Sequence, residues 1–332
     1  MPLSIEYCHY AVVDTPLVFM ILLSFIFILN ILVYGRLKDY LLGGFFTGLA
    51  IATKYSAGIL ILPIILVHLF ASKKRGSLKA ILGHQFILCL AFVFLGFFLS
   101  CPFAILDFPK FSSDIRDEIL CAKIGWFGWE RTNPHLIHLS HLKDGLSIPL
   151  LIISFFGLIF AIIKREKADL IFLAFVITYY LIISKGVNPY SRFMLPLLPF
   201  LVIFAGRLLA DLKNWAINKK IGFLFFVLLL FLLAGPLYRS IKIDFYFTLP
   251  NTATLAKEWV EKNIPPASKI LLNEYGPPLT QSPEGIRLKS SLKSQEALQY
   301  GYHKKRNLFY EIKEEVARKK ISYELSYIPY PI

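Results

Sequence analysis

Three ionisable residues stand beside or inside long apolar stretches of this 332-residue sequence. Asp14 lies three residues before one apolar run, Lys54 lies in the middle of another, and Arg192 begins a third. A lysine at the centre of a bilayer costs about 2.5 to 3.5 kcal/mol, so its presence there needs a reason. Carboxylates can accept protons, and cations in an apolar setting bind phosphate. We therefore take the three residues as candidates for chemistry on a lipid-linked phosphate or diphosphate.

Each of these residues also has an alternative or a complicating feature. Asp14 precedes Pro16 at the start of an expected helix, where the helix dipole favours a carboxylate. Lys54 could extend to the membrane surface along its apolar stem without any function. Arg192 is expected on the outer side of the membrane, whereas basic residues are usually more frequent on the inner side. Its planar guanidinium suits a phosphate. The sequence leaves the choice between structural and chemical roles open for Asp14 and Lys54.

The elements that must position these residues are membrane helices. Hydrophobic residues make up 56% of the sequence and charged residues 17%, a balance that a soluble fold of this length could not bury. A helix needs about 20 apolar residues to cross a bilayer. The sequence therefore predicts a mainly α polytopic transmembrane bundle over residues 1–249, with a soluble tail over residues 250–332. The apolar runs are 17–35, 41–70, 81–106, 148–163, 169–184, 192–210 and 221–238.

Charges between the runs predict the orientation. The formal net charge is +14, but the basic residues lie in short connections beside apolar runs, which the positive-inside rule explains without nucleic-acid binding. The connection 107–147 lacks this excess, so we place it and the C-terminal tail outside the cell membrane. The basic residues that indicate the cytoplasmic side are Arg36, Lys38, Lys73, Lys74, Arg75, Lys79, Lys164, Arg165, Lys167, Arg207, Lys213, Lys219 and Lys220.

The run 41–70 does not fit a single crossing. Basic residues flank both of its ends, and thirty helical residues would extend about 45 Å. A pair of short helices that turns back within the membrane satisfies both the charges and the length. Polar residues and a glycine place the turn within 52–58, with Lys54 at its outer apex.

The outer connection 107–147 contains two further groups of interest. The aromatic cluster 126–129 suits either a sugar platform or an anchor at the membrane surface. His135, His138 and His141 share one face of an expected helix, where they could bind a divalent metal or only make hydrogen bonds. The sequence predicts no other cofactor, and its four cysteines form no pattern of a disulfide framework or zinc site.

The tail is expected to form a small extracytoplasmic α/β unit. Residues 252–263 read as an amphipathic helix with Leu255, Trp259 and Val260 on one face. A strand over 269–275, a second helix over 307–319 and a second strand over 321–328 complete the expectation.

Three segments, 10–17, 44–55 and 191–199, resemble successive motifs of the GT-C membrane glycosyltransferases. The nearest branch is the protein O-mannosyltransferase and aminoarabinose-transferase type, and the likeness runs over most of 10–275. The resemblance implies transfer of a sugar from a polyprenyl-phosphate donor to a protein or lipid acceptor at the extracytoplasmic face. By the same resemblance, Asp14 corresponds to the second acidic motif. Lys54 and Arg192, with Tyr55 and Tyr190 beside them, correspond to residues near the donor phosphate.

The sequence departs from this family at the catalytic base. The family's catalytic aspartate lies in an outer loop that follows a first membrane helix, and this sequence begins about where that loop should be complete. Upstream of Asp14 only Glu6 offers a carboxylate, and its spacing does not fit. We therefore expect a fragment, or a chain completed by a second one, that is inactive or nearly so alone. A non-catalytic membrane subunit and a transporter are the alternatives.

Overall fold

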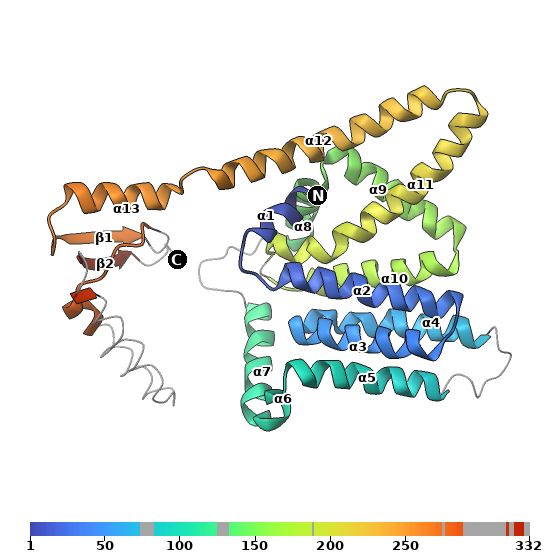
Figure 1. Ribbon diagram of the computed structural model, residues 1–332, viewed down its shortest axis with the longest axis horizontal. Coiled ribbons are helices and arrows are strands. Elements are labelled where there is room, and N and C mark those ends of the chain that lie inside the picture. The colour runs from blue at the N-terminus through green and yellow to red at the C-terminus, as the bar shows by residue number, and fades with distance from the viewer. Residues whose placement is uncertain are drawn as a thin grey trace. The chain divides into compact units, whose positions relative to one another are not determined.

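The computed structural model describes residues 1–73, 83–124, 133–187, 189–273, 276–287, 317–318 and 322–328. The chain divides into two compact units, Met1–Tyr246 and Phe247–Ile332. Figure 1 gives the labels of the helices and strands used below.

The first unit is a bundle of helices, which confirms the predicted mainly α membrane fold. Among the residues that the structure describes, four helical segments are long and apolar enough to cross a bilayer, and a fifth is counted if α8 (Pro134–Leu146) and α9 (Ile148–Lys164), bent by 110°, form one span. The four are Asp14–Val33, Tyr55–Ser72, Ser191–Asn218 and Gly222–Asn263. The elements are α1 Pro2–Cys8, α2 Asp14–Val33, α3 Leu37–Thr53, η1 Tyr55–Leu60, α4 Ile61–Lys73, α5 His84–Ser100, α6 Phe103–Leu106, α7 Phe108–Ile124, α8 Pro134–Leu146, α9 Ile148–Lys164, α10 Lys167–Ile183, η3 Ser191–Leu197, α11 Leu198–Asn218 and α12 Gly222–Thr248.

The apolar run 41–70 is broken at Lys54, as predicted. Lys54 has an extended backbone (φ −159°, ψ 127°) between α3 and the 3₁₀ turn η1. The two arms are longer than the predicted short helices, because α3 already begins at Leu37. From the rise per residue of α- and 3₁₀-helices, α3 is about 26 Å long, and η1 with α4 is about 31 Å long. Each arm is therefore close to the thickness of a hydrocarbon core, so the predicted pair of short helices is instead a pair of nearly membrane-spanning length.

Two other helix ends differ from the apolar runs. Helix α5 stops at Ser100 rather than 106, because the residue before Pro102 is disfavoured in a helix. Helix α12 continues to Thr248, ten residues past the run that ended at 238. Its charged last part makes polar contacts within the first unit: Asp244 lies 3.0 Å from the His9 ring, and Arg239 lies 3.7 Å from Asp144.

Small residues bring helices α3 and α5 into close contact. A Cβ atom on Gly44 would meet the backbone of Cys89, and one on Gly48 would meet the backbone of Val93. From the other side, a Cβ atom on Gly96 would meet the backbone of Phe45. Close packing of this kind is a principal cause of helix association in membranes, where the hydrophobic effect contributes little to the free energy of association.

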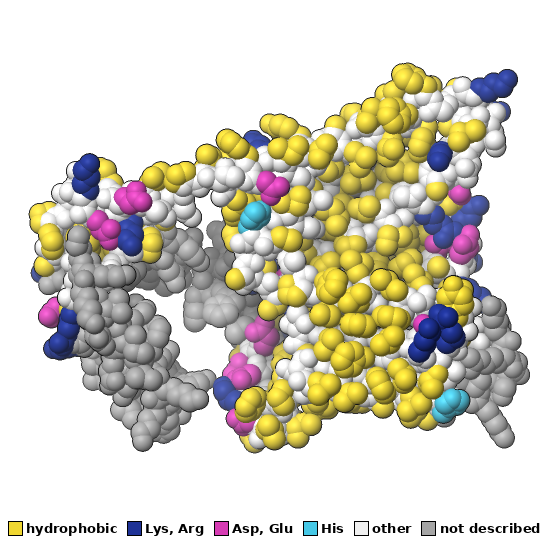
Figure 2. Space-filling view, viewed as in Figure 1, with side chains coloured by type: hydrophobic (Ala, Val, Ile, Leu, Met, Phe, Trp, Pro, Cys, Tyr) yellow, Lys and Arg dark blue, Asp and Glu magenta, His cyan; other side chains and the backbone are white. Residues whose placement is uncertain are grey.

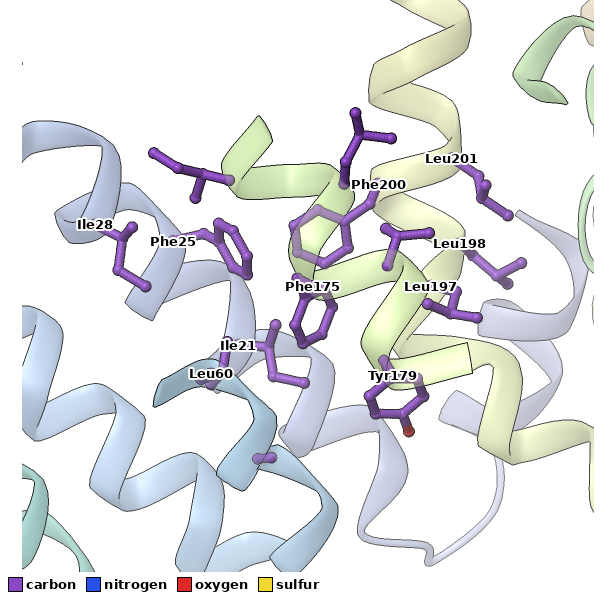
Figure 3. Packing of buried hydrophobic residues seen from close by; sticks show 14 of the residues in the cluster. Ile21, Phe25, Ile28, Leu60, Phe175, Tyr179, Leu197, Leu198, Phe200 and Leu201 are labelled. Atoms are coloured by element: carbon purple, nitrogen blue, oxygen red, sulfur yellow. The ribbon is translucent and has the colours of Figure 1, made fainter. Parts of the chain in front are cut away.

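An aromatic cluster joins helices that lie far apart in the sequence. Phe25 of α2, Phe175 of α10 and Phe200 of α11 pack together, with ring centroids 4.6 to 5.2 Å apart. Figure 3 shows these rings meeting at the centre of the bundle, with Tyr179 one turn further along α10. This cluster holds the start of α11 against α2 and so fixes the segment η3 that carries Arg192.

The first unit has one strongly basic end. The α2–α3 and α9–α10 connections lie at that end in Figure 1, and Lys and Arg side chains gather there in Figure 2. Arg207 of α11 pairs with Asp169 of α10 and lies 2.6 Å from Glu166. The N-terminus of α2 lies at the opposite end (Figure 1), and Lys54 lies there too, because it contacts Asp14, the first residue of α2.

The second unit contains helix α13 (Thr252–Asn263) and two short parallel strands, β1 (Lys269–Asn273) and β2 (Glu324–Ile328). Val260 of α13 packs on a small core of Leu272, Leu279, Tyr323 and Leu325. The predicted helix over 252–263 is confirmed, although Leu255 and Trp259 of its apolar face remain 49% and 61% exposed. The predicted second helix, 307–319, falls almost entirely outside the described residues.

Candidate functional site

Asp14, Lys54 and Arg192 meet in space, although 178 residues separate the first from the last. The Lys54 Nζ lies 2.6 Å from Asp14 Oδ1, and the Arg192 Nε lies 3.8 Å from Asp14 Oδ2. The Asp14 side chain is 2% exposed, whereas those of Lys54 and Arg192 are 23% and 37% exposed. A buried carboxylate thus faces two cations whose side chains remain partly exposed.

Breaks and ends of helices position the three side chains. Asp14 is the first residue of α2, Lys54 occupies the extended link after α3, and Arg192 is the second residue of η3. None of them sits in the middle of a regular helix, so each can project along the bundle axis at the end away from the basic connections. The helix dipole and the two cations both favour a carboxylate at this position, because Asp14 meets the cations in the first turn of α2.

Aromatic rings support both cations. The Lys54 ammonium lies 4.2 Å from the centroid of the Phe193 ring, and the Arg192 guanidinium carbon lies 4.9 Å from the centroid of Tyr190. The buried Arg192 Nε has no hydrogen-bond partner among the described residues. The guanidinium is therefore oriented by stacking and keeps donors for a ligand.

A cavity of about 500 Å³ opens beside this group. Its lining includes Glu118 and Ala122 of α7, which the sequence analysis did not single out. Helix α7 is held at the cavity because the Val187 amide donates to the Ala122 carbonyl at 3.0 Å. The lining residues are Ala11, Val12, Val13, Asp14, Lys54, Glu118, Ala122, Gly186, Tyr190, Arg192 and Phe193.

The two tyrosines named with the cations have different surroundings. Tyr190 lines the cavity beneath the Arg192 guanidinium. Tyr55 does not line it; its ring is 47% exposed and lies edge-on to Phe111 of α7, with centroids 6.0 Å apart. Tyr55 thus steadies α7 rather than contacting the space beside Lys54.

The three histidines lie on α8 as predicted, but they do not converge on one point. His135 Nδ1 lies 3.3 Å from the Tyr180 hydroxyl, and His141 Nε2 donates to the Pro189 carbonyl at 2.8 Å. His138 is fully buried, and neither of its ring nitrogens has a partner among the described residues. In the part of the chain that the structure describes, no three side chains are placed to hold a metal ion. The aromatic cluster 126–129 lies outside that part.

Glu6 lies away from the cavity. It belongs to α1, where burial raises its carboxyl pKa and the nearby Asp144 of α8 adds to the effect. The same helix braces the site in another way, because the Tyr7 hydroxyl lies 2.7 Å from the Ser191 hydroxyl at the start of η3. Glu6 is therefore poorly placed to act on a ligand bound between Lys54 and Arg192.

Residues 1–99 match the family described as dolichyl-phosphate-mannose-protein mannosyltransferase. This confirms the resemblance to membrane glycosyltransferases over that part of the chain, which includes Asp14 and Lys54 but not Glu118 or Arg192. The family name implies a lipid-linked sugar donor and a membrane setting. No curated protein and no solved structure matches the chain.

Proposed function

We propose that this chain serves a membrane glycosyltransferase by binding the phosphate of a polyprenyl-phosphate sugar donor between Lys54 and Arg192. The observation that carries the proposal is the convergence of the two cations on one buried carboxylate beside a cavity of about 500 Å³. The family matched by residues 1–99 supports the same class of donor.

The charges suit a donor phosphate. A sugar linked through a phosphodiester carries one negative charge, and transfer of the sugar leaves a lipid phosphate with more. Lys54 and Arg192 would therefore bind the leaving group more tightly as the bond breaks, which is the requirement for lowering the barrier. Asp14 keeps both cations in place when the donor is absent, because its two oxygens face one cation each.

The location suits donor and acceptor alike. The cavity lies at the end of the bundle opposite the basic connections, which by the positive-inside rule is the extracytoplasmic end. A lipid-anchored phosphate reaches that level from the bilayer, and a protein or lipid acceptor reaches it from outside. Transfer at the extracytoplasmic face of a cell membrane follows as part of the proposal.

Binding of dolichyl phosphate to the purified chain in detergent micelles tests the donor site. Lys54→Ala and Arg192→Ala should each weaken binding about 10- to 100-fold, because each removes a charge-assisted hydrogen bond worth about 1.5 to 3 kcal/mol. Arg192→Lys should restore only part of the affinity, since an ammonium lacks the planar fork.

Arg239→Ala is the matched control. Arg239 is an exposed cation of α12 near Asp144, away from the cavity lining, and its loss should leave the affinity within twofold. Equal affinity in the wild-type chain, Lys54→Ala and Arg192→Ala would refute the proposed donor site. Such a result would favour the reading of a non-catalytic membrane subunit.

A further inference from the structure

Helix α13 of the second unit has two different faces. Val260 and Ile264, the residue that follows the helix, pack against the small core of that unit. Leu255 and Trp259 share another face, because they are one turn apart, and both side chains are exposed. Val260 lies about 140° around the helix from Leu255 and about 100° from Trp259. The exposed pair therefore lies off the side of α13 that packs on the core.

The exposed face has the composition of a helix that lies on a membrane surface. Lys262 is exposed one turn beyond Trp259, and Thr252 and Glu258 border the apolar pair. Tryptophan is enriched where a bilayer meets water, because its ring is apolar and its indole N–H is polar. A lysine stem can lie along the same surface while its ammonium stays in water near the lipid phosphates. Such a face favours the headgroup region of a bilayer over bulk water.

The chain itself holds α13 close to the bilayer. Helix α12 begins as an apolar span, and the exposed aromatic residues Phe245, Tyr246 and Phe247 gather in its last turns, as is typical of the bilayer boundary. Only residues 249–251 connect α12 to α13, which allows at most about 14 Å between the two helix ends. The first turn of α13 therefore begins within reach of the bilayer surface.

A contact within the first unit supports this level for the end of α12. Asp244 lies 3.0 Å from the ring of His9, and His9 stands just before Asp14, where the span α2 begins. The two chain segments are thus at the same height, one entering the bilayer and the other leaving it. Residues that follow Asp244 lie near the boundary between lipid and water.

We propose that α13 lies on the lipid surface where α12 ends, with Leu255 and Trp259 among the headgroups and upper acyl chains. Two apolar side chains suffice for this contact, because α12 already holds the helix at the membrane. A stable protein interface, by contrast, needs about 20 residues on each side. The contact anchors the second unit, and it does not depend on the donor site.

The fluorescence of Trp259 tests this contact in the full chain. The other three tryptophans, Trp126, Trp129 and Trp215, are replaced by phenylalanine. The chain is placed in nanodiscs of phosphatidylcholine, either unmodified or with bromine on the upper part of one acyl chain. Because bromine quenches tryptophan only at short range, Trp259 should lose most of its emission in the brominated lipid. Iodide in the water should quench it severalfold less than it quenches free tryptophan.

Thr254→Trp in a chain that also carries Trp259→Phe is the matched control. Thr254 is exposed on the same helix, about 140° around it from Trp259. A tryptophan at this position should be quenched more by iodide and less by the brominated lipid than Trp259 is.

Leu255→Asp, in the chain whose only tryptophan is Trp259, puts a charge on the proposed lipid face and should raise the quenching of Trp259 by iodide. Strong quenching of Trp259 by iodide and none by brominated lipid would overturn the proposal, because the face would then lie in water. Protection from both quenchers would overturn it as well, since a protein surface would then cover the face.

Discussion

At the scale of single residues, three buried aspartates of the first unit each meet a cation. Asp39 pairs with Arg36 three residues away, and Asp169 pairs with Arg207 of the next helix along the bundle. Asp14 differs because its two partners come from two distant segments and line a cavity. A buried ion pair alone is weak support for either stability or function, so it is the adjoining cavity that distinguishes Asp14.

Glu6 gives a prediction at this scale. Its pKa is raised in the folded chain, first by burial and then by Asp144, so the folded state holds a proton more readily than the unfolded state. Stability should therefore fall as the pH rises from about 4.5 through the raised pKa. Glu6→Gln should remove this dependence and stabilise the chain at neutral pH, measured by thermal unfolding in detergent between pH 4 and 8.

Glu258→Gln is the comparison for Glu6, because Glu258 is exposed on α13 in the other unit. It should leave the pH dependence of unfolding unchanged. A Glu6→Gln chain that loses stability in the same way as the wild type on going from pH 4 to 8 would contradict the prediction.

At the scale of elements, the arrangement of α3 decides where Lys54 lies. Helix α3 packs closely on α5 through Gly44, Gly48 and Gly96, and it ends where Lys54 becomes extended. Any side chain at the glycine positions would push the helices apart and shift the end of α3. The cavity beside Lys54 therefore depends on contacts made about two to three turns away along α3.

Gly48→Ala tests this dependence. The added methyl group would meet the backbone of α5 at Val93, and overpacking of this kind costs about 1 to 3 kcal/mol. We expect a lower unfolding temperature and weaker dolichyl-phosphate binding. Gly206→Ala is the matched control, because nothing lies within 4 Å of a Cβ atom there and alanine favours a helix. Equal unfolding temperatures of the two variants would show that the α3–α5 contact tolerates a methyl group.

At the scale of the whole molecule, charge divides the first unit into a basic end and a cavity end. The basic connections follow α2, α4, α9 and α11, and by the positive-inside rule they face the cytoplasm. The connections at the cavity end, and the tail that follows α12, are then external. We propose this topology for the chain as a multi-pass membrane protein.

Single cysteines test the topology in intact cells. In a chain whose four native cysteines are serine, Lys185→Cys and Lys262→Cys should react with a maleimide that cannot cross membranes. Lys164→Cys should react only after the cells are permeabilised, which also shows that this cysteine is accessible. Labelling of Lys164→Cys and protection of Lys262→Cys in intact cells would reverse the proposed orientation.

The sequence by itself determined the membrane class, the helical fold and the break at Lys54. These follow from composition, run length and charge at the ends of runs, all of which act locally along the chain. It also singled out Asp14, Lys54 and Arg192, because isolated charges beside apolar runs are costly wherever they finally lie.

Only the tertiary structure decided which of the candidate residues meet. Glu118 is one of several acids in an amphipathic helix, and nothing in its local sequence separates it from Asp117; its place follows from the anchoring of α7 to Tyr55 and Val187. Equal spacing on α8 likewise did not bring the histidines together on one ligand, because His135 meets the Tyr180 hydroxyl and His141 the Pro189 carbonyl, while the ring nitrogens of His138 have no hydrogen-bond partner among the described residues. Packing between distant helices selects the site, and that selection has no local signal in the sequence.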